Sequence, residues 1–298
     1  MTAAGEKAAD AAAFAFPPIG YGTFPLKERL VDAIPMAVRC GYRLVDTSDN
    51  YGNEESAGRG LSACGAERAD VVVVTKFSNP LRTGALACCF EKSRKKLGGV
   101  VDVYLLHWPY PFLWREQWRR MEELYFAGRC RAIGVCNFDR PKMEALLKIC
   151  RVRPAVNQFE RHPLFQQCET AAFCREQGVA VMCYSPLARM DARLMQNPVL
   201  MDLAAKYGKK VGQIVLRWSV EQGDIPIPAS GTEAHIRENF NVFDFQLAQD
   251  DMERIDALES GIRIRFDPAR RFTVKNKARF LLCRMKQTAR KLLVKGGS

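Results

Sequence analysis

Polar and titratable side chains follow a series of short apolar runs in the sequence, each at the point where its run ends. Asp46, Lys76 and His107 close three of these runs. Other runs are closed by four polar residues: Asn137, Gln158, Ser185 and Ser230. Strand ends are often polar simply because loops are hydrated. A carboxylate, an ammonium and an imidazole in equivalent positions nevertheless favour a shared site, and these groups carry out general acid–base chemistry.

Apolar β-rich runs alternate with longer amphipathic stretches, which is the pattern of βα units around a parallel sheet. Eight runs are predicted strands: Phe16–Gly22, Arg43–Asp46, Val71–Lys76, Val101–His107, Arg131–Asn137, Ala155–Gln158, Val179–Ser185 and Asp224–Ser230. The helices predicted between them are Leu26–Cys40, Glu54–Leu61, Glu91–Leu97, Trp114–Ala127, Lys142–Cys150, Cys168–Glu176, Pro198–Tyr207 and Val211–Glu221. This order predicts an α/β fold, the (β/α)8 TIM barrel. In a barrel the C-terminal strand ends surround one cleft, where the seven polar residues would meet.

The formal charge of +12 is concentrated at the C-terminus. Residues 261–298 hold twelve Lys or Arg and one Asp, so they carry +11 and residues 1–260 carry only +1. A near-neutral body with a basic appendage differs from a basic nucleic-acid-binding domain, and no nucleic-acid partner is expected. We predict a flexible leader at residues 1–15, one barrel domain at 16–260 and a basic helical extension at 261–298.

The composition is that of an ordinary globular protein, with 48% hydrophobic and 26% charged residues. No apolar run approaches the roughly 20 residues needed to cross a bilayer, and residues 1–15 lack the pattern of a secretory signal. The 11 cysteines show no CxxC motif or zinc-like spacing, which indicates reduced thiols and a cytoplasmic location. Three histidines, His107, His162 and His235, are too few for paired metal ligands, and no metal site is expected.

The C-terminal extension has a helical pattern over residues 274–294, with apolar residues on one face and Lys and Arg around it. Such a helix suits an anionic membrane surface, so residues 274–295 are predicted to hold the protein at the periphery of a membrane. Two alternatives stay open. The apolar face also fits packing on the outside of the barrel or docking of a protein partner.

Several longer motifs occur in order along the chain. The first are Gly20-Tyr21-Gly22-Thr23, Gly41-Tyr42-Arg43 and Val45-Asp46-Thr47-Ser48-Asp49-Asn50-Tyr51-Gly52-Asn53-Glu54. Those that follow are Val74-Thr75-Lys76, Asp102-Val103-Tyr104-Leu105-Leu106-His107-Trp108-Pro109, Ile133-Gly134-Val135-Cys136-Asn137-Phe138, Pro154-Ala155-Val156-Asn157-Gln158, Tyr184-Ser185-Pro186-Leu187 and Glu238-Asn239-Phe240. Taken together, these motifs resemble the aldo-keto reductase family and occur in that family's order. The resemblance runs from about residue 16 to 260, and the chain is most similar to the compact microbial members. Ordered motifs of this length are far more specific than a lone glycine fingerprint.

The resemblance implies a nicotinamide-dependent carbonyl reductase, in which NADPH or NADH supplies a hydride and the protein supplies a proton. The implied catalytic residues are Asp46, Tyr51, Lys76 and His107. Tyr51 would be the general acid, and the Lys76 ammonium is expected to lower its pKa from the usual value of about 10. Asp46 would hold Lys76 by an ion pair, although a purely structural buried pair is the alternative. His107 would orient or polarise the substrate oxygen.

The resemblance also implies which residues contact the cofactor and a small-molecule carbonyl substrate. Asn137 and Gln158 would bond the nicotinamide carboxamide, and Tyr184 would stack on its ring. The full set expected at the cofactor is Thr23, Asp46, Asn137, Gln158, Tyr184, Ser185, Leu187, Ser230, Thr232, Glu238 and Asn239. The set expected at the substrate is Phe24, Tyr51, His107 and Trp108. The alternative for Phe24 and Trp108 is that they are ordinary apolar side chains that only fill space.

Three positions depart from the family pattern. Cys136 replaces a serine with a thiol, which is a poorer hydrogen-bonding group. Ala229 and His235 stand where the family commonly has a Lys and an Arg that contact the 2′-phosphate of NADPH. Losing these cations removes much of the reason to prefer NADPH. We therefore predict relaxed specificity or a preference for NADH, with Arg237 as a substitute partner.

Two other functions compete with an active reductase. A cofactor-binding regulatory or scaffolding subunit of the same fold would be free to lose Tyr51 or Lys76, and both are present. A metal-dependent barrel hydrolase would need paired histidine and carboxylate ligands. The residues therefore favour the reductase. The substrate depends on loop shapes, although Arg263 and Arg265 either favour an acidic or sugar-like substrate or brace the last helix.

Overall fold

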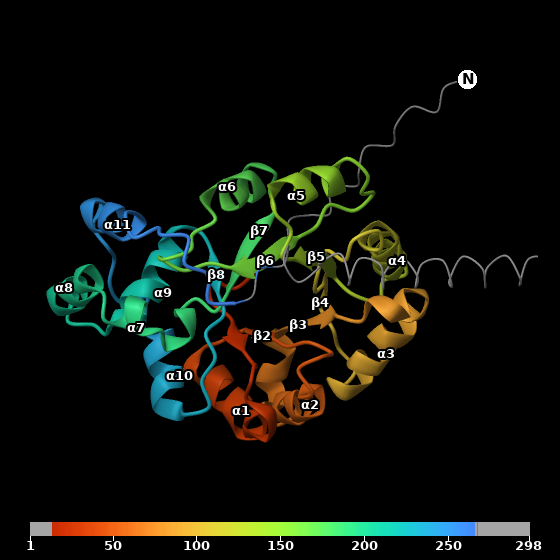
Figure 1. The fold of residues 1–298 in the computed structure, drawn as a ribbon. Coiled ribbons are helices and arrows are strands. Elements are labelled where there is room, and N and C mark those ends of the chain that lie inside the picture. Colours follow the sequence, from red (N-terminus) through yellow and green to blue (C-terminus); the bar gives the residue numbers. More distant parts are fainter. Residues whose placement is uncertain (1–13, 266, 268–298) are drawn as a thin grey trace, which may run out of the picture.

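A computed structural model describes residues 14–265 and 267 and shows a parallel sheet that curls into a barrel (Figure 1). Its eight strands lie side by side in chain order: β1 (Tyr21–Gly22), β2 (Leu44–Asp46), β3 (Val72–Phe77), β4 (Val103–Leu106), β5 (Ala132–Cys136), β6 (Val156–Glu160), β7 (Ala180–Tyr184) and β8 (Ile225–Pro226). Each strand overlaps one of the predicted runs. The predicted (β/α)8 fold is therefore confirmed.

The sheet closes between its first and last strands. The backbone amide of Gly20 donates a hydrogen bond to the carbonyl oxygen of Pro226 at 2.9 Å. The amide of Gly22 donates to the carbonyl oxygen of Pro228 at 2.9 Å. A Cβ atom on Gly22 would lie only 2.8 Å from the carbonyl oxygen of Ile227, so a glycine is needed where these strands meet. Closure gives all the C-terminal strand ends one common mouth.

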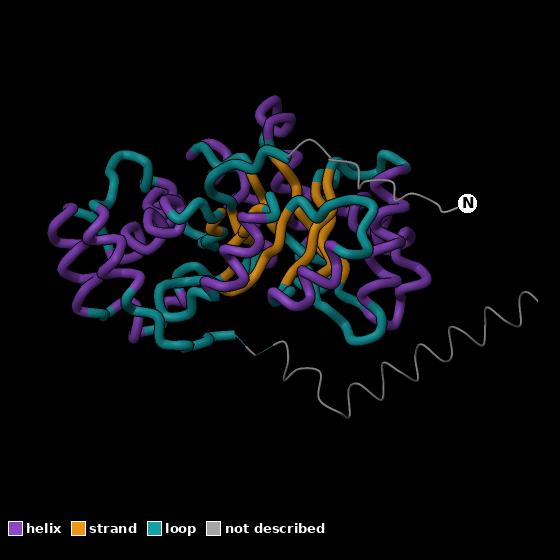
Figure 2. Tube along the Cα trace, turned by 90° about the horizontal axis from the view of Figure 1, so that it is seen from above, coloured by secondary structure: helices purple, strands orange, loops and turns teal. Residues whose placement is uncertain are grey.

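Helices surround the sheet on the outside of the barrel (Figure 2). The α-helices are α1 (Leu30–Cys40), α2 (Glu54–Ser62), α3 (Leu86–Lys96), α4 (Trp114–Phe126), α5 (Arg140–Leu147), α6 (Cys168–Glu176), α7 (Ala192–Met195), α8 (Pro198–Tyr207), α9 (Val211–Glu221), α10 (Glu233–Phe240) and α11 (Gln249–Asp256). Short 3₁₀ helices are η1 (Lys27–Arg29), η2 (Gly65–Asp70), η3 (Pro80–Ala85) and η4 (Ala188–Met190). All eight predicted helices are present, but α1 begins at Leu30 rather than Leu26 and α3 begins at Leu86 rather than Glu91.

Local signals set several of these helix ends. The side chain of Asp139 caps α5 by accepting a hydrogen bond from the amide of Lys142 at 3.0 Å. α8 begins after Asn197, whose side chain accepts from the amide of Val199 at 3.0 Å. The same helix ends at Gly208, which has a φ of 62° in the left-handed region that glycine adopts most easily.

Helices α7, α10 and α11 were not predicted from the sequence. α7 has only 4 residues, and α10 and α11 have 8 residues each and a largely polar sequence. Such short segments contain too few apolar positions to show a clear helical period. Each is anchored instead by one buried apolar side chain: Leu194 in α7, Ile236 in α10 and Ile255 in α11.

The barrel has a core on each side of the sheet. The inner core contains the residues Leu44, Val72, Val74, Val103, Leu105, Ala132, Cys136, Val156, Met182, Ile225 and Ile227. Their neighbours along the strands, such as Val45, Val73 and Tyr104, belong to the shell that packs against the helices. Because both faces are buried, the strands are continuous apolar runs rather than alternating ones.

Some sequence predictions concern residues that the structure does not describe. The predicted leader falls mainly on residues 1–13, and the predicted basic helix at 274–294 lies wholly outside the described residues. Within residues 14–265 and 267, no helix is long and apolar enough to cross a membrane.

Candidate active site

Asp46, Tyr51, Lys76 and His107 come from three βα units and approach one another at the C-terminal mouth of the barrel. The Nζ atom of Lys76 lies 2.8 and 2.7 Å from the two carboxylate oxygens of Asp46. It also donates to the carbonyl oxygen of Thr47 at 2.6 Å, and the hydroxyl of Tyr51 lies 3.4 Å away. The structure therefore places an ammonium between a carboxylate and a phenol.

The ion pair of Lys76 and Asp46 is shielded from solvent. The side chain of Lys76 is fully buried and that of Asp46 is 3% exposed. Burial disfavours the charged amine, but the neighbouring Asp46 carboxylate outweighs this effect and holds the pKa of Lys76 above its usual value. Lys76 is therefore a permanent positive charge beside Tyr51 at neutral pH.

Burial raises the pKa of Tyr51 to about 12, and the positive charge of Lys76 acts in the opposite direction. The lowering by Lys76 that the sequence predicts is present, but burial is the larger effect. Tyr51 is consequently a protonated phenol over the whole neutral range. That is the form a proton donor needs.

His107 is held by two serine hydroxyls that the sequence analysis did not single out. Its Nδ1 atom lies 2.6 Å from the hydroxyl of Ser78 and 3.0 Å from that of Ser48. The ring lies 5.9 Å from the Tyr51 ring, measured between centroids, and stacks on Trp108 at 5.4 Å. Ser78 follows Lys76 by two positions, so its place just after a strand was the available signal.

A cavity of about 360 Å³ lies over this cluster. Nine of the predicted site residues line it: Thr23, Phe24, Asp46, Tyr51, His107, Trp108, Tyr184, Ser185 and Leu187. Phe24 covers Tyr51 at a centroid distance of 5.1 Å. Arg189 and Met190 also line the cavity and were missed, because they lie in η4, a 3₁₀ helix of 3 residues that is too short to show a periodic pattern.

Three predicted residues stand behind the cavity wall rather than on it. Lys76 is one of them. Gln158 donates a hydrogen bond to Asp46 at 2.8 Å. Asn137 donates to the carbonyl oxygen of His107 at 3.1 Å and accepts from the hydroxyl of Tyr184 at 2.8 Å. Gln158 lies in β6 and Asn137 directly follows β5, so these two amides connect Asp46 and His107 to strands further along the chain.

Cys136 stands where the family usually has serine, and it is 1% exposed. Burial raises the pKa of this thiol above its usual value, although the nearby Lys76 charge opposes the shift. Cys136 is therefore a neutral thiol behind the ion pair.

The cavity extends from Tyr51 toward Ala229, at the end of the barrel where α10 begins. Ser230 and Thr232 lie just beyond, and the Ser230 hydroxyl accepts from the amide of Thr232 at 3.3 Å. His235 is exposed on α10, with its Nδ1 atom 3.6 Å from a carboxylate oxygen of Glu238. Neither cation of the family pattern is present here.

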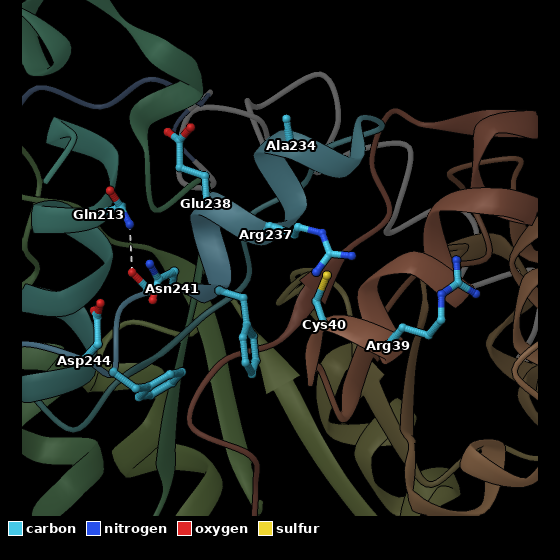
Figure 3. A pocket seen from close by; sticks show the side chains of 10 residues that line it. Arg39, Cys40, Gln213, Ala234, Arg237, Glu238, Asn241 and Asp244 are labelled. Atoms are coloured by element: carbon cyan, nitrogen blue, oxygen red, sulfur yellow. Dashed lines mark hydrogen bonds between the residues drawn. The ribbon is translucent and has the colours of Figure 1, made fainter.

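Arg237 and Glu238 line a second, open cavity of about 800 Å³ between α1, α9 and α10. Figure 3 shows Arg237 pointing toward Cys40 of α1, while Glu238 lies on the opposite side of α10. Arg237 pairs with Glu233 at 2.7 Å, and Glu238 pairs with Lys210 at 2.7 Å. Asn239, the remaining predicted residue, is 8% exposed.

Comparisons with known proteins agree with this geometry. Residues 18–260 match the model of the aldo/keto reductase family, so the chain belongs to that family. It is 42% identical to the oxidoreductase YtbE of Bacillus subtilis (strain 168) over 85% of this chain and 92% of that protein. It is 38% identical to the glyoxal reductase of the same organism, over 85% of this chain and 92% of that protein.

A solved structure extends the likeness to a cofactor complex. An aldo-keto reductase of Bombyx mori in complex with NADP is 32% identical, with a TM-score of 0.79 over 84% of this chain and 92% of that one. The family predicted from the sequence is confirmed. The chain is an NAD(P)H-dependent oxidoreductase, and the family supports reduction of carbonyl groups.

Proposed function

We propose that the protein reduces a small aldehyde or ketone to an alcohol, with Tyr51 as the proton donor. The observation that carries this proposal is the 3.4 Å approach of the Lys76 amine to the Tyr51 hydroxyl at the wall of the cavity. A buried positive charge stabilises the negative charge that develops on a phenol as its proton leaves. Tyr51 lines the cavity and is the phenol of this cluster that lies beside the Lys76 charge.

The cavity suits a nicotinamide cofactor. The Thr23 hydroxyl is buried and has no hydrogen-bond partner among the described residues, although a buried hydroxyl normally has one. Tyr184 presents an aromatic ring to the same space. When bound, the cofactor supplies a hydride to the carbonyl carbon.

The other three residues support the proton transfer. Asp46 fixes Lys76 through two short contacts, so the charge stays beside the phenol. Nδ1 of His107 is engaged by the hydroxyls of Ser78 and Ser48, and we propose that Nε2 donates a hydrogen bond to the substrate oxygen.

We propose that the cofactor lies along the cavity from Tyr51 toward Ala229. Asn137, Gln158 and Tyr184 are the proposed partners of the nicotinamide. The residues proposed to contact the remainder are Thr23, Ser185, Leu187, Ser230, Thr232, Glu238 and Asn239. The missing cations at Ala229 and His235 support use of NADH as well as NADPH, with Arg237 as the cation that would substitute.

We propose small carbonyl compounds as substrates, because a relative with 38% identity is a glyoxal reductase. Phe24 and Trp108 would line the substrate end, where they flank Tyr51 and His107. The aromatic walls would exclude water from the reacting carbonyl.

The proposal is tested by following oxidation of NADPH and NADH with glyoxal and methylglyoxal. Tyr51→Phe should lower kcat by about 100-fold or more, since general acid catalysis contributes about that much. Quenching of protein fluorescence on cofactor addition should be unchanged in this variant. If the wild type binds the cofactor but reduces no carbonyl compound, a regulatory or scaffolding subunit is the better description.

A further inference from the structure

The segment after α11 turns back across the C-terminal mouth of the barrel. The amides of Ser260 and Ile262 donate to the carbonyl oxygen of Leu164 at 3.3 and 3.0 Å. The carboxylate of Glu259 accepts a hydrogen bond from the amide of Gln166. These contacts seat residues 259–262 on the loop that follows β6.

A buried carboxylate then fixes the next two residues. Glu160, the last residue of β6, is fully buried. Its Oε1 atom accepts from the amide of Ile264 at 2.7 Å and from that of Arg265 at 3.0 Å, and its Oε2 atom accepts from Arg265 at 3.1 Å. His162 lies 3.3 Å away on the same oxygen Oε1. A buried carboxylate is costly unless it is hydrogen-bonded, so this contact specifies the position of the segment.

The anchored segment brings a guanidinium to the substrate end of the cavity. Arg265 lines the same cavity as Tyr51, and its Cζ atom lies 5.6 Å from the centre of the Phe24 ring. Arg189 lines the cavity from the loop after β7. The acidic side chain among the described lining residues is Asp46, which is already paired with Lys76.

We infer that Arg265, positioned by Glu160, binds a carboxylate on the carbonyl substrate. This inference rests on the proposed function and names the substrate class as acidic aldehydes or ketones. A guanidinium at a partly enclosed site forms charge-assisted hydrogen bonds with a carboxylate. The centre of the Phe24 ring lies 5.6 Å from the Cζ atom of Arg265 and 5.1 Å from the centre of the Tyr51 ring, so one aromatic side chain contacts both groups. The inference places the carboxylate at the end of the substrate away from the reacting carbonyl.

The test compares 4-formylbenzoate with 4-formylbenzamide, which have the same ring and aldehyde and differ in charge. With the full-length protein and saturating cofactor, kcat/KM should be about tenfold or more higher for the carboxylate. Arg265→Gln should reduce this ratio to about one and leave kcat/KM for the amide nearly unchanged. Added salt should lower the ratio in the wild type.

Arg263→Gln is the matched control, since Arg263 belongs to the same segment but lies 4.3 Å over the ring of Phe165. It should keep the wild-type ratio. Glu160→Gln should raise KM for the carboxylate with a smaller effect on the amide, because the segment is held less firmly. A wild-type ratio near one, or an unchanged ratio in Arg265→Gln, would overturn the inference while leaving the proposed reductase intact.

Binding gives a second readout that does not need turnover. Terephthalate, which carries a carboxylate at each end of the same ring, should bind to the cofactor complex in calorimetry and bind about tenfold more weakly to Arg265→Gln. Equal binding to the two proteins would overturn the inference. Absence of turnover with either aldehyde, together with Arg265-dependent binding, would instead count against the proposed function alone.

Discussion

The Lys76 amine lies 3.4 Å from the Tyr51 hydroxyl, although the two residues come from different βα units and are 25 positions apart. The same amine contacts both carboxylate oxygens of Asp46. One arrangement therefore has two possible roles, a support for proton transfer or a purely structural ion pair. These roles make different predictions for single and double variants.

Lys76→Met should lower kcat by about 100-fold or more and also destabilise the fold. Removing one partner of a buried pair leaves an uncompensated charge, which typically costs about 3–5 kcal/mol. The double variant Asp46→Asn with Lys76→Met removes both charges and should recover most of that stability, as measured by denaturant unfolding. It should not recover activity. Activity that returns together with stability would show that the pair is only structural.

The pH dependence should show no ionisation of Tyr51 in the neutral range. A proton donor is active when protonated, so its activity is complete below its pKa and is lost as the pH rises through it. Burial raises the pKa of Tyr51 to about 12. The rate of carbonyl reduction should therefore be free of a Tyr51 ionisation between about pH 6 and pH 10. Ultraviolet difference titration of the wild type against Tyr51→Phe measures this phenol directly, and a phenolate appearing near neutral pH would contradict the prediction.

The two serines at His107 should affect catalysis unequally. The Ser78 hydroxyl lies 2.6 Å from Nδ1 and the Ser48 hydroxyl lies 3.0 Å from it. Ser78→Ala should lower kcat/KM by about 2- to 10-fold, the range expected for one neutral hydrogen bond, and Ser48→Ala should have the smaller effect. Cofactor affinity should stay constant in both variants.

The chain has three histidines, so nitrogen NMR can follow the His107 ring in these variants. Ser78→Ala should change the Nδ1 signal of His107 and leave those of His162 and His235 unchanged. An unaltered Nδ1 signal combined with an unaltered rate would show that the hydroxyls do not orient this ring.

The position of the charged cluster was predictable because it depends on strand ends. Asp46 ends β2, Lys76 lies in β3, and His107 directly follows β4. Once the barrel topology is predicted, the geometry of parallel strands brings these residues to one mouth without any knowledge of the loops. Tyr51 was predicted through the motif that contains it rather than through a periodic pattern.

Contacts that depend on loop shape could not be predicted in this way. The Ser48 and Ser78 contacts with His107 require particular side-chain orientations, which leave no periodic signal in the sequence. The anchoring of Arg265 by Glu160 joins residues 105 positions apart, and one of them lies in an irregular segment. The sequence singled out Arg265 but left open whether it faces substrate or braces the last helix.

Cofactor choice should respond to cations at the Ala229 end of the cavity. Wild-type protein should bind NADPH less than about a hundredfold more tightly than NADH, because Ala229 and His235 provide no fixed cations for the 2′-phosphate. Ala229→Lys with His235→Arg should tighten NADPH binding by about tenfold or more and leave NADH binding nearly unchanged, as measured by fluorescence quenching. This gain in affinity for NADPH should be smaller at high salt.

Arg237→Gln tests whether Arg237 acts in the wild type as the substitute cation for the 2′-phosphate of NADPH. Arg237 is already paired with Glu233 at 2.7 Å, so any contact it makes with the 2′-phosphate competes with that pair. We expect only a small loss of NADPH affinity, about 10-fold or less, and no change for NADH. Arg39→Gln, which alters a neighbouring cation of the same open cavity, is the matched control and should change neither affinity. A wild-type preference for NADPH well above a hundredfold that survives Arg237→Gln would contradict this account, because the missing cations would then have been replaced from elsewhere in the chain.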